Sequence, residues 1–168
     1  MSPSIAADSG LVDLFAQLRV GVLITLKRDG RPQSSVVGHT FDPATLTARI
    51  SITDDRAKTR NLRRDPRASY HVTRPDLYAY AVGEAVADLT PVATDPHDPT
   101  VEALIGYYRA MAGEHPDWDD YRTAMGGRAP TAADPALRPH LRLDPAHLTP
   151  PPWPAPDRPC HTHSATCR

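Results

Sequence analysis

The chain has 168 residues, the size of one ordinary domain, and its 40% hydrophobic and 23% charged residues exclude a fibrous or wholly disordered protein. Its net charge of −1 gives no overall attraction to nucleic acid or to a membrane surface, so we expect neither as a partner. No apolar run approaches the ~20 residues of a membrane-spanning helix. The N-terminus has no basic region followed by an apolar one, so a cytoplasmic protein is expected.

The first part of the chain predicts one helix and three strands. Leucine and phenylalanine recur at helical spacing over 11–18, and Ser9 precedes them as an N-cap. Asp29 and Gly30 form a strong hairpin signal, and residues 42–45 predict a second turn. The strands on either side of these turns are expected at 20–27, 32–41 and 46–53.

An arginine-rich helix is expected over 56–64. Asp54 or Asp55 would cap its N-terminus, and Pro66 ends it after Asp65. Two further strands follow, at 68–73 and 77–89. Gly83 lies inside the second of these and predicts a bend or bulge there.

The last part of the chain predicts helices over 100–112 and 117–125 and a closing strand over 137–143. Residues 149–168 contain six prolines and few residues that could pack, so an extended or disordered tail is expected there. The folded domain would then span 1–148.

Hairpins dominate this pattern, and one helix crosses between the third and fourth strands. Short antiparallel strands with helices at their ends are typical of α+β small barrels. We therefore predict an antiparallel β-barrel with flanking helices.

The most informative stretch is 54–67, which holds six of the 19 basic residues. Five arginines in it follow one helical stripe, whereas Lys58 lies on the opposite side, near Leu62. A lysine turned inward at a helix N-terminus, beside Arg56, is suited to bind a phosphate. The competing interpretation is an ordinary charged surface helix.

The hairpin at 29–30, the strand ending at Thr53 and the segment 56–67 together resemble a known family. This family comprises the flavin- and deazaflavin-binding split β-barrels (the FMN-binding split-barrel type) related to pyridoxamine 5′-phosphate oxidase. The most specific part of the resemblance is the Lys-x-x-Asn-Leu-x-x-Asp-Pro sequence over 58–66. Within the family, the chain is most similar to the branch that uses the deazaflavin coenzyme F420.

The resemblance implies a homodimer with two cofactor sites, each built from both subunits at the barrel interface. Arg56 and Lys58 would hold the cofactor phosphate, and Asn61 would support that end of the site. The residues expected near the ring lie on the second and third strands and are Gln33, Ser35, Ser51, Ile52 and Thr53. For each serine or threonine, a plain strand residue remains the alternative.

The resemblance further implies an F420H2-dependent reductase that transfers a hydride to a small, electron-poor organic substrate. Ser34, Ser35 and Val36 stand where true pyridoxamine phosphate oxidases carry a basic residue, which favours F420 over FMN. Asp55 stands where a small residue is usual and would weaken phosphate binding. The alternatives are an FMN-binding oxidoreductase like pyridoxamine phosphate oxidase and a non-catalytic flavin- or haem-binding barrel.

Other candidate sites are weaker. Cys160 and Cys167 enclose two histidines, but their spacing matches no usual zinc pattern, so no metal site is expected. Both cysteines lie in the last nine residues and cannot link parts of the core, which fits a reducing compartment. His39 and His71 are expected as structural barrel residues, and no catalytic side chain is assigned.

Overall fold

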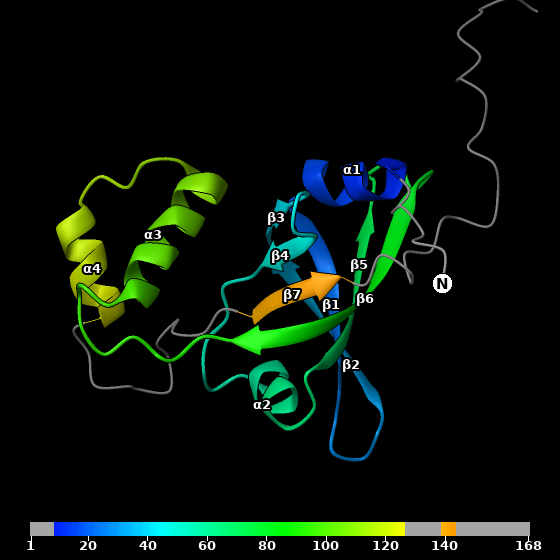
Figure 1. Cartoon of the computed structure of the whole chain (residues 1–168), viewed down its shortest axis with the longest axis horizontal. Coiled ribbons are helices and arrows are strands. Elements are labelled where there is room, and N and C mark those ends of the chain that lie inside the picture. Colours follow the sequence, from blue (N-terminus) through cyan, green and yellow to red (C-terminus); the bar gives the residue numbers. More distant parts are fainter. Residues whose placement is uncertain (1–8, 127–138, 144–168) are drawn as a thin grey trace, which may run out of the picture.

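Residues 9–126 and 139–143 are described by the computed structural model. In these described ranges seven strands form one sheet with the order β2-β1-β5-β6-β7-β4-β3 (Figure 1), and all of their pairings are antiparallel. The strands are β1 (Val20–Leu26), β2 (Pro32–Gly38), β3 (Thr40–Asp42), β4 (Thr47–Arg49), β5 (Arg67–Thr73), β6 (Tyr80–Leu89) and β7 (Pro139–Leu143). The helices are α1 (Ser9–Gln17), α2 (Ala57–Arg64), α3 (Pro99–Ala112) and α4 (Trp118–Gly126).

The sheet curls because its two edge strands are neighbours in the chain. β2 and β3 occupy opposite ends of the strand order, yet only His39 separates them. The prediction of one continuous strand over 32–41 is therefore wrong, since the chain changes direction at His39 and passes to the other edge. The antiparallel α+β fold is confirmed, but within the described residues the strand pairing forms an open, curled sheet and not a closed barrel.

The hairpin between β1 and β2 forms at the predicted turn. Backbone hydrogen bonds join Lys27 to Arg31 and to Gly30, and Gly30 has a φ of 81°, which glycine adopts without strain. The side chain of Asp29 also accepts from the backbone amide of Arg31. This arrangement is a three-residue loop, one of the common hairpin connections.

Three local predictions are wrong. The third strand is much shorter than 46–53, because regular pairing ends at Arg49 and residues 50–53 continue outside the ladder except for a single bridge at Ile52. Neither Asp54 nor Asp55 caps α2, whose N-cap residue is Arg56. Gly83 causes no bulge, since the register of β5 and β6 is continuous and pairs Gly83 directly with Tyr70.

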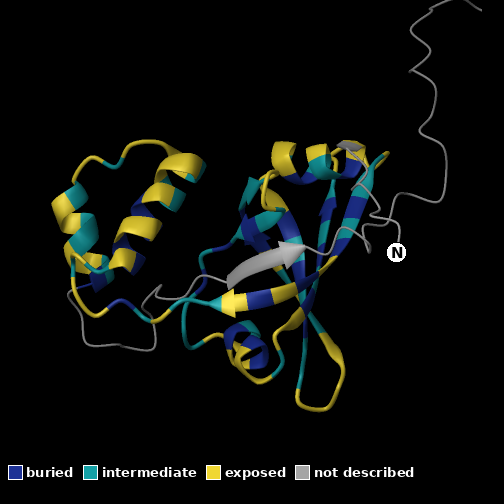
Figure 2. Cartoon of the chain, viewed as in Figure 1, coloured by how far each residue is buried: buried dark blue, intermediate teal, exposed yellow. Residues whose placement is uncertain are grey.

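The main core lies inside the curl of the sheet, and its largest buried side chains include Phe15, Leu23, Ile50 and Tyr70. Figure 2 shows this buried face between α1 at one end of the sheet and α2 at the other. α3 and α4 lie to one side (Figure 1) and pack around a separate small cluster that includes Val101 and Ile105.

None of the helices in the described ranges combines the length and the apolar character that crossing a membrane requires. The predicted tail over 149–168 lies outside the described residues, as do Cys160 and Cys167.

Candidate functional site

A pocket of about 310 Å³ opens between the end of β2, the loop after β4 and the first turn of α2. It brings together five of the eight residues predicted for the cofactor site. Its lining consists of Val36, Val37, Gly38, Ser51, Ile52, Thr53, Arg56 and Lys58. The volume lies at the lower end of the range for small-molecule sites.

The loop that carries Ser51, Ile52 and Thr53 is held in place from α2. The hydroxyl of Thr59, which is fully buried, donates to the backbone oxygen of Thr53 at 2.7 Å. The Nε of Arg56 donates to the hydroxyl of the same Thr53 at 2.9 Å. These two bonds fix the loop against the start of the helix, so the pocket residues of both segments keep one relative position.

Lys58 lies on the inner side of α2, as predicted from its helical position. Leu62, one turn further, is 2% exposed and belongs to the core. Burial lowers the pKa of the Lys58 ammonium, and the positive charge of Arg56 lowers it further. The side-chain ammonium of Lys58 forms no hydrogen bond or ion pair with the described residues. An anionic ligand would relieve both effects, because an opposite charge favours the protonated ammonium.

The donor set of this pocket fits a phosphate group. The first turn of α2 has backbone amides without partners inside the helix, and its N-cap residue supplies no side-chain acceptor for them. Lys58 and Arg56 add two cationic groups beside these amides, and Ser51 adds a hydroxyl. Helix N-termini combined with cations bind phosphates through hydrogen bonds and charge together.

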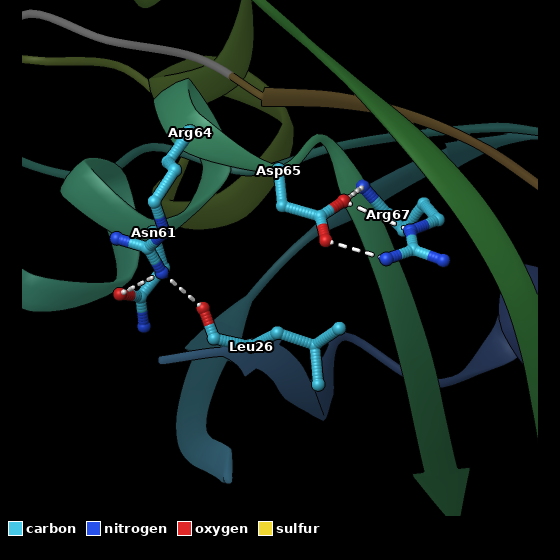
Figure 3. A network of polar contacts seen from close by, with 5 residues as sticks. All are labelled: Leu26, Asn61, Arg64, Asp65 and Arg67. Atoms are coloured by element: carbon cyan, nitrogen blue, oxygen red, sulfur yellow. Dashed lines mark hydrogen bonds and ion pairs between the residues drawn. The ribbon is translucent and has the colours of Figure 1, made fainter. Parts of the chain in front are cut away.

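Most arginines near α2 are already engaged by partners within the protein. Arg63 pairs with Asp54, and Arg67 pairs with Asp65 at 2.8 Å. In Figure 3 the guanidinium of Arg64 contacts the backbone oxygen of Leu26, at 2.6 Å. The basic stripe is therefore largely neutralised or used to hold the fold, which leaves Lys58 and Arg56 as the cations of the pocket.

Asn61, one of the predicted site residues, lies outside the pocket and connects α2 to the sheet. Its amide nitrogen donates to the hydroxyl of Thr25 at 3.1 Å and to the side-chain oxygen of Gln33 at 2.9 Å. Its amide oxygen accepts from Arg64 at 3.1 Å (Figure 3). Gln33 thus contacts Asn61, and neither it nor Ser35 lines the pocket.

Sequence reasoning missed the contribution of Val36, Val37 and Gly38. By strand alternation Val37 shares the face of Gln33 and Ser35, but the pocket is lined by three consecutive residues at the end of β2. The signal that could have found them is Gly38, at the point where α3 approaches the strand. The hydroxyl of Tyr107 donates to the backbone oxygen of Gly38 at 3.0 Å, and a side chain at Gly38 would press on Met111.

His39 is a structural residue, as predicted. It is 1% exposed, and both of its ring nitrogens lie at hydrogen-bond distance from partners. Within residues 9–126 and 139–143, no group of three or more histidine, cysteine or acidic side chains is placed to hold a metal ion.

Residues 8–148 match the pyridoxamine 5′-phosphate oxidase family. This match covers most of the chain, and the protein therefore belongs to this family. The family predicted from the hairpin and the segment 56–67 is confirmed.

Solved structures with the same fold include proteins of different function. An F420 reductase is 24% identical with a TM-score of 0.54, and the alignment covers 80% of this chain and 94% of that one. A conserved hypothetical protein from Mycobacterium tuberculosis is 19% identical with a TM-score of 0.59, and the alignment covers 89% of this chain and 87% of that one. HutZ, a haem storage protein from Vibrio cholerae, is 14% identical with a TM-score of 0.57, and the alignment covers 82% of this chain and 90% of that one. At these identities the likeness establishes the fold alone.

Proposed function

We propose that this protein is an F420-dependent oxidoreductase that reduces a small, electron-poor organic substrate. The observation that carries the proposal is the pocket in which the half-buried Lys58, Arg56 and the N-terminus of α2 converge. Bound F420H2 would supply the hydride for such a reduction. An oxidoreductase is also the class expected from membership of the pyridoxamine 5′-phosphate oxidase family.

In this proposal the protein binds and orients the cofactor, and none of its side chains is given the role of proton donor. Lys58 and Arg56 hold the phosphate through charge-assisted hydrogen bonds. Ser51 and Thr53 contact the polar edge of the ring together with the backbone of Ile52. Val36 and Val37 provide an apolar wall. The substrate would receive its proton from solvent or from a tyrosine.

F420 is favoured over FMN by the residues of β2. Ser34, Ser35 and Val36 add no cation for the phosphate of FMN, and the described lining of the pocket has two cations, Lys58 of α2 and its N-cap residue Arg56. The solved F420 reductase shows that the same fold can serve this cofactor. A flavin- or haem-binding protein without catalysis is the second candidate, because the haem storage protein shares the fold as well.

We further propose that the protein acts as a homodimer whose second subunit completes the pocket. Val20, Val36 and Val86 are more than half exposed, at 57%, 73% and 58%, although they lie within strands. By strand pairing all three face the outer side of the sheet, opposite the core. Val36 also lines the pocket, so a subunit packed on this face would border the cofactor site.

Fluorescence-quenching titrations with F420 and, in parallel, with FMN test the proposal. The wild-type protein should bind F420 saturably and FMN more weakly. Lys58→Ala should weaken F420 binding on the order of 10–100-fold, because a charge-assisted hydrogen bond is lost.

The matched control is Lys27→Ala, at the only other lysine of the chain, which lies in the hairpin and outside the pocket. It should leave F420 affinity unchanged. Equal affinity of the wild type and Lys58→Ala would refute the phosphate assignment. Saturable haem binding without F420 binding would favour the second candidate.

A further inference from the structure

The carboxylate of Asp55 is in an unusual position beside the pocket. Its Oδ1 is buried and, among the described residues, is the only buried side-chain polar atom without a hydrogen bond. The nearest cation is the Nε of Arg56, at 3.8 Å, which is too far for a hydrogen bond. The Asp55 side chain as a whole is 36% exposed, so the burial is confined to this one oxygen, and an oxygen buried without a hydrogen bond calls for an explanation.

Among the described residues, the one cation paired with the carboxylate of Asp55 is Arg56, which lines the pocket. Its neighbour Asp54 is paired with Arg63, and Arg60 donates to the backbone oxygen of Asp55 and not to its carboxylate. Arg56 in turn uses its Nε to hold Thr53. The phosphate end of the pocket therefore has two positive charges, Lys58 and Arg56, and beside them the carboxylate of Asp55, whose one ion pair among the described residues is the 3.8 Å contact with Arg56.

We propose that Asp55 makes this pocket selective for a phosphodiester over a phosphomonoester. This inference rests on the proposed function of the same pocket. A diester carries one negative charge, which matches the net charge of +1 from Lys58, Arg56 and Asp55. A monoester carries about 1.5 to 2 negative charges at neutral pH, and Asp55 would repel the additional charge.

The difference in phosphate charge between a diester and a monoester separates two classes of cofactor. In F420 the phosphate joins the ring-bearing side chain to the rest of the molecule as a diester. In FMN it is a terminal monoester. Asp55 would thus influence which cofactor binds through its negative charge near the phosphate and through the position of Arg56. It would not contact the ring. It is a specificity-determining residue and not a catalytic one.

Asp55→Asn tests this inference because it removes the charge and keeps the shape. Dissociation constants are measured for F420, for FMN, for the 4′,5′-cyclic phosphate diester of riboflavin, and for riboflavin itself. The last three ligands share one ring system and differ in phosphate charge. Asp55→Asn should tighten FMN binding on the order of tenfold. The affinities for both diesters should change less than about threefold, and riboflavin binding should not change.

Two variants control for indirect effects. Asp54→Asn removes the adjacent acidic charge and should leave the ratio of FMN to cyclic diester affinity as in the wild type. Asp55→Glu keeps the negative charge and should also keep the wild-type ratio. Thermal unfolding of each variant shows that it folds. The inference is overturned if Asp55→Asn leaves the ratio unchanged, or if Asp54→Asn shifts it equally.

The outcomes separate this inference from the proposed function. F420 binding that depends on Lys58, with no change of ratio in Asp55→Asn, overturns the role of Asp55 alone. A ratio that changes in Asp55→Asn, in a protein that binds the flavins but not F420, supports the role of Asp55 and overturns the F420 assignment. Absence of binding to all four ligands in every variant overturns both.

Discussion

The hydroxyl of Tyr70 lies 2.7 Å from Nδ1 of His39 in the interior of the protein. The other ring nitrogen of His39 lies 3.0 Å from the backbone oxygen of Phe15, which can only accept. Nε2 therefore carries the proton, and Nδ1 accepts from Tyr70. Because His39 is the single residue between the two edge strands, this chain of bonds ties α1, the corner of the curled sheet and the middle of β5 together.

Tyr70→Phe should destabilise the fold by about 1–3 kcal/mol, because Nδ1 of His39 would remain buried without a donor. The ring of phenylalanine fills nearly the same space, so packing changes little. Urea unfolding measures the loss. Tyr78→Phe, at a side chain that is 56% exposed, should change the free energy of unfolding by less than about 0.5 kcal/mol. Equal stability of Tyr70→Phe and wild type would contradict the role given to this bond.

Stability should fall as the pH falls from about 7 to about 5. Burial lowers the pKa of His39 in the folded state. The hydrogen bond to the backbone of Phe15 raises this pKa in part, and the charge of Arg19 lowers it again. The unfolded chain takes up the proton near pH 6.5. It then binds more protons than the folded state, which favours unfolding. The free energy of unfolding, measured by urea titration at several pH values, should therefore rise with pH through this range.

His39→Gln should reduce the slope of stability against pH in this range, since the titrating group is gone. The carboxyl groups of Asp29, Asp42 and Asp65 do not interfere, because hydrogen bonds lower their pKa values and place their effect on stability at more acidic pH. A wild-type stability that is flat between pH 5 and 7 would count against a neutral, buried His39.

The sequence allows part of the site to be predicted and leaves the rest to tertiary contacts. Lys58 was placed on the inner side of α2 by helical periodicity alone, and Leu62 behind it is buried as expected. This inference depends on local spacing, which a sequence records. The residues Ser51 to Thr53 were expected from the family resemblance, and they line the same pocket as Lys58.

Partners distant in the chain could not be predicted in this way. Asn61 was assigned to the cofactor, but its amide is engaged by Thr25 and Gln33, 36 and 28 residues away. The arginine stripe looked like free positive charge, but Arg64 is held by a backbone oxygen of β1. The break at His39 likewise follows from the curl of the whole sheet. The fold class and the segments that line the pocket could be predicted from the sequence. The hydrogen-bond partner of each polar side chain could not, because it depends on which distant residues the fold places next to it.

Gly21→Ala should destabilise the protein by about 1–3 kcal/mol through overpacking. An added Cβ at Gly21 would lie 2.7 Å from the ring and hydroxyl of Tyr70 and 2.7 Å from the backbone oxygen of His71. The matched control is Gly106→Ala in α3, where nothing lies within 4 Å of the added atom. Because alanine favours the helix, this control should be neutral or stabilising by up to about 1 kcal/mol. Thermal or urea unfolding of both variants decides the matter, and equal effects at the two glycines would rule out the close contact with Tyr70.

Asn61→Ala should mainly affect stability and only secondarily cofactor binding. The substitution removes three hydrogen bonds, of which the one to the buried Thr25 cannot be replaced by water, so we expect a loss of about 1–3 kcal/mol. Gln33→Ala removes one of these bonds at a half-buried position and should have a smaller effect. F420 affinity should fall less in Asn61→Ala than in Lys58→Ala, because Asn61 positions α2 and does not line the pocket. Unchanged stability together with a loss of affinity as large as that of Lys58→Ala would instead place the Asn61 amide on the ligand.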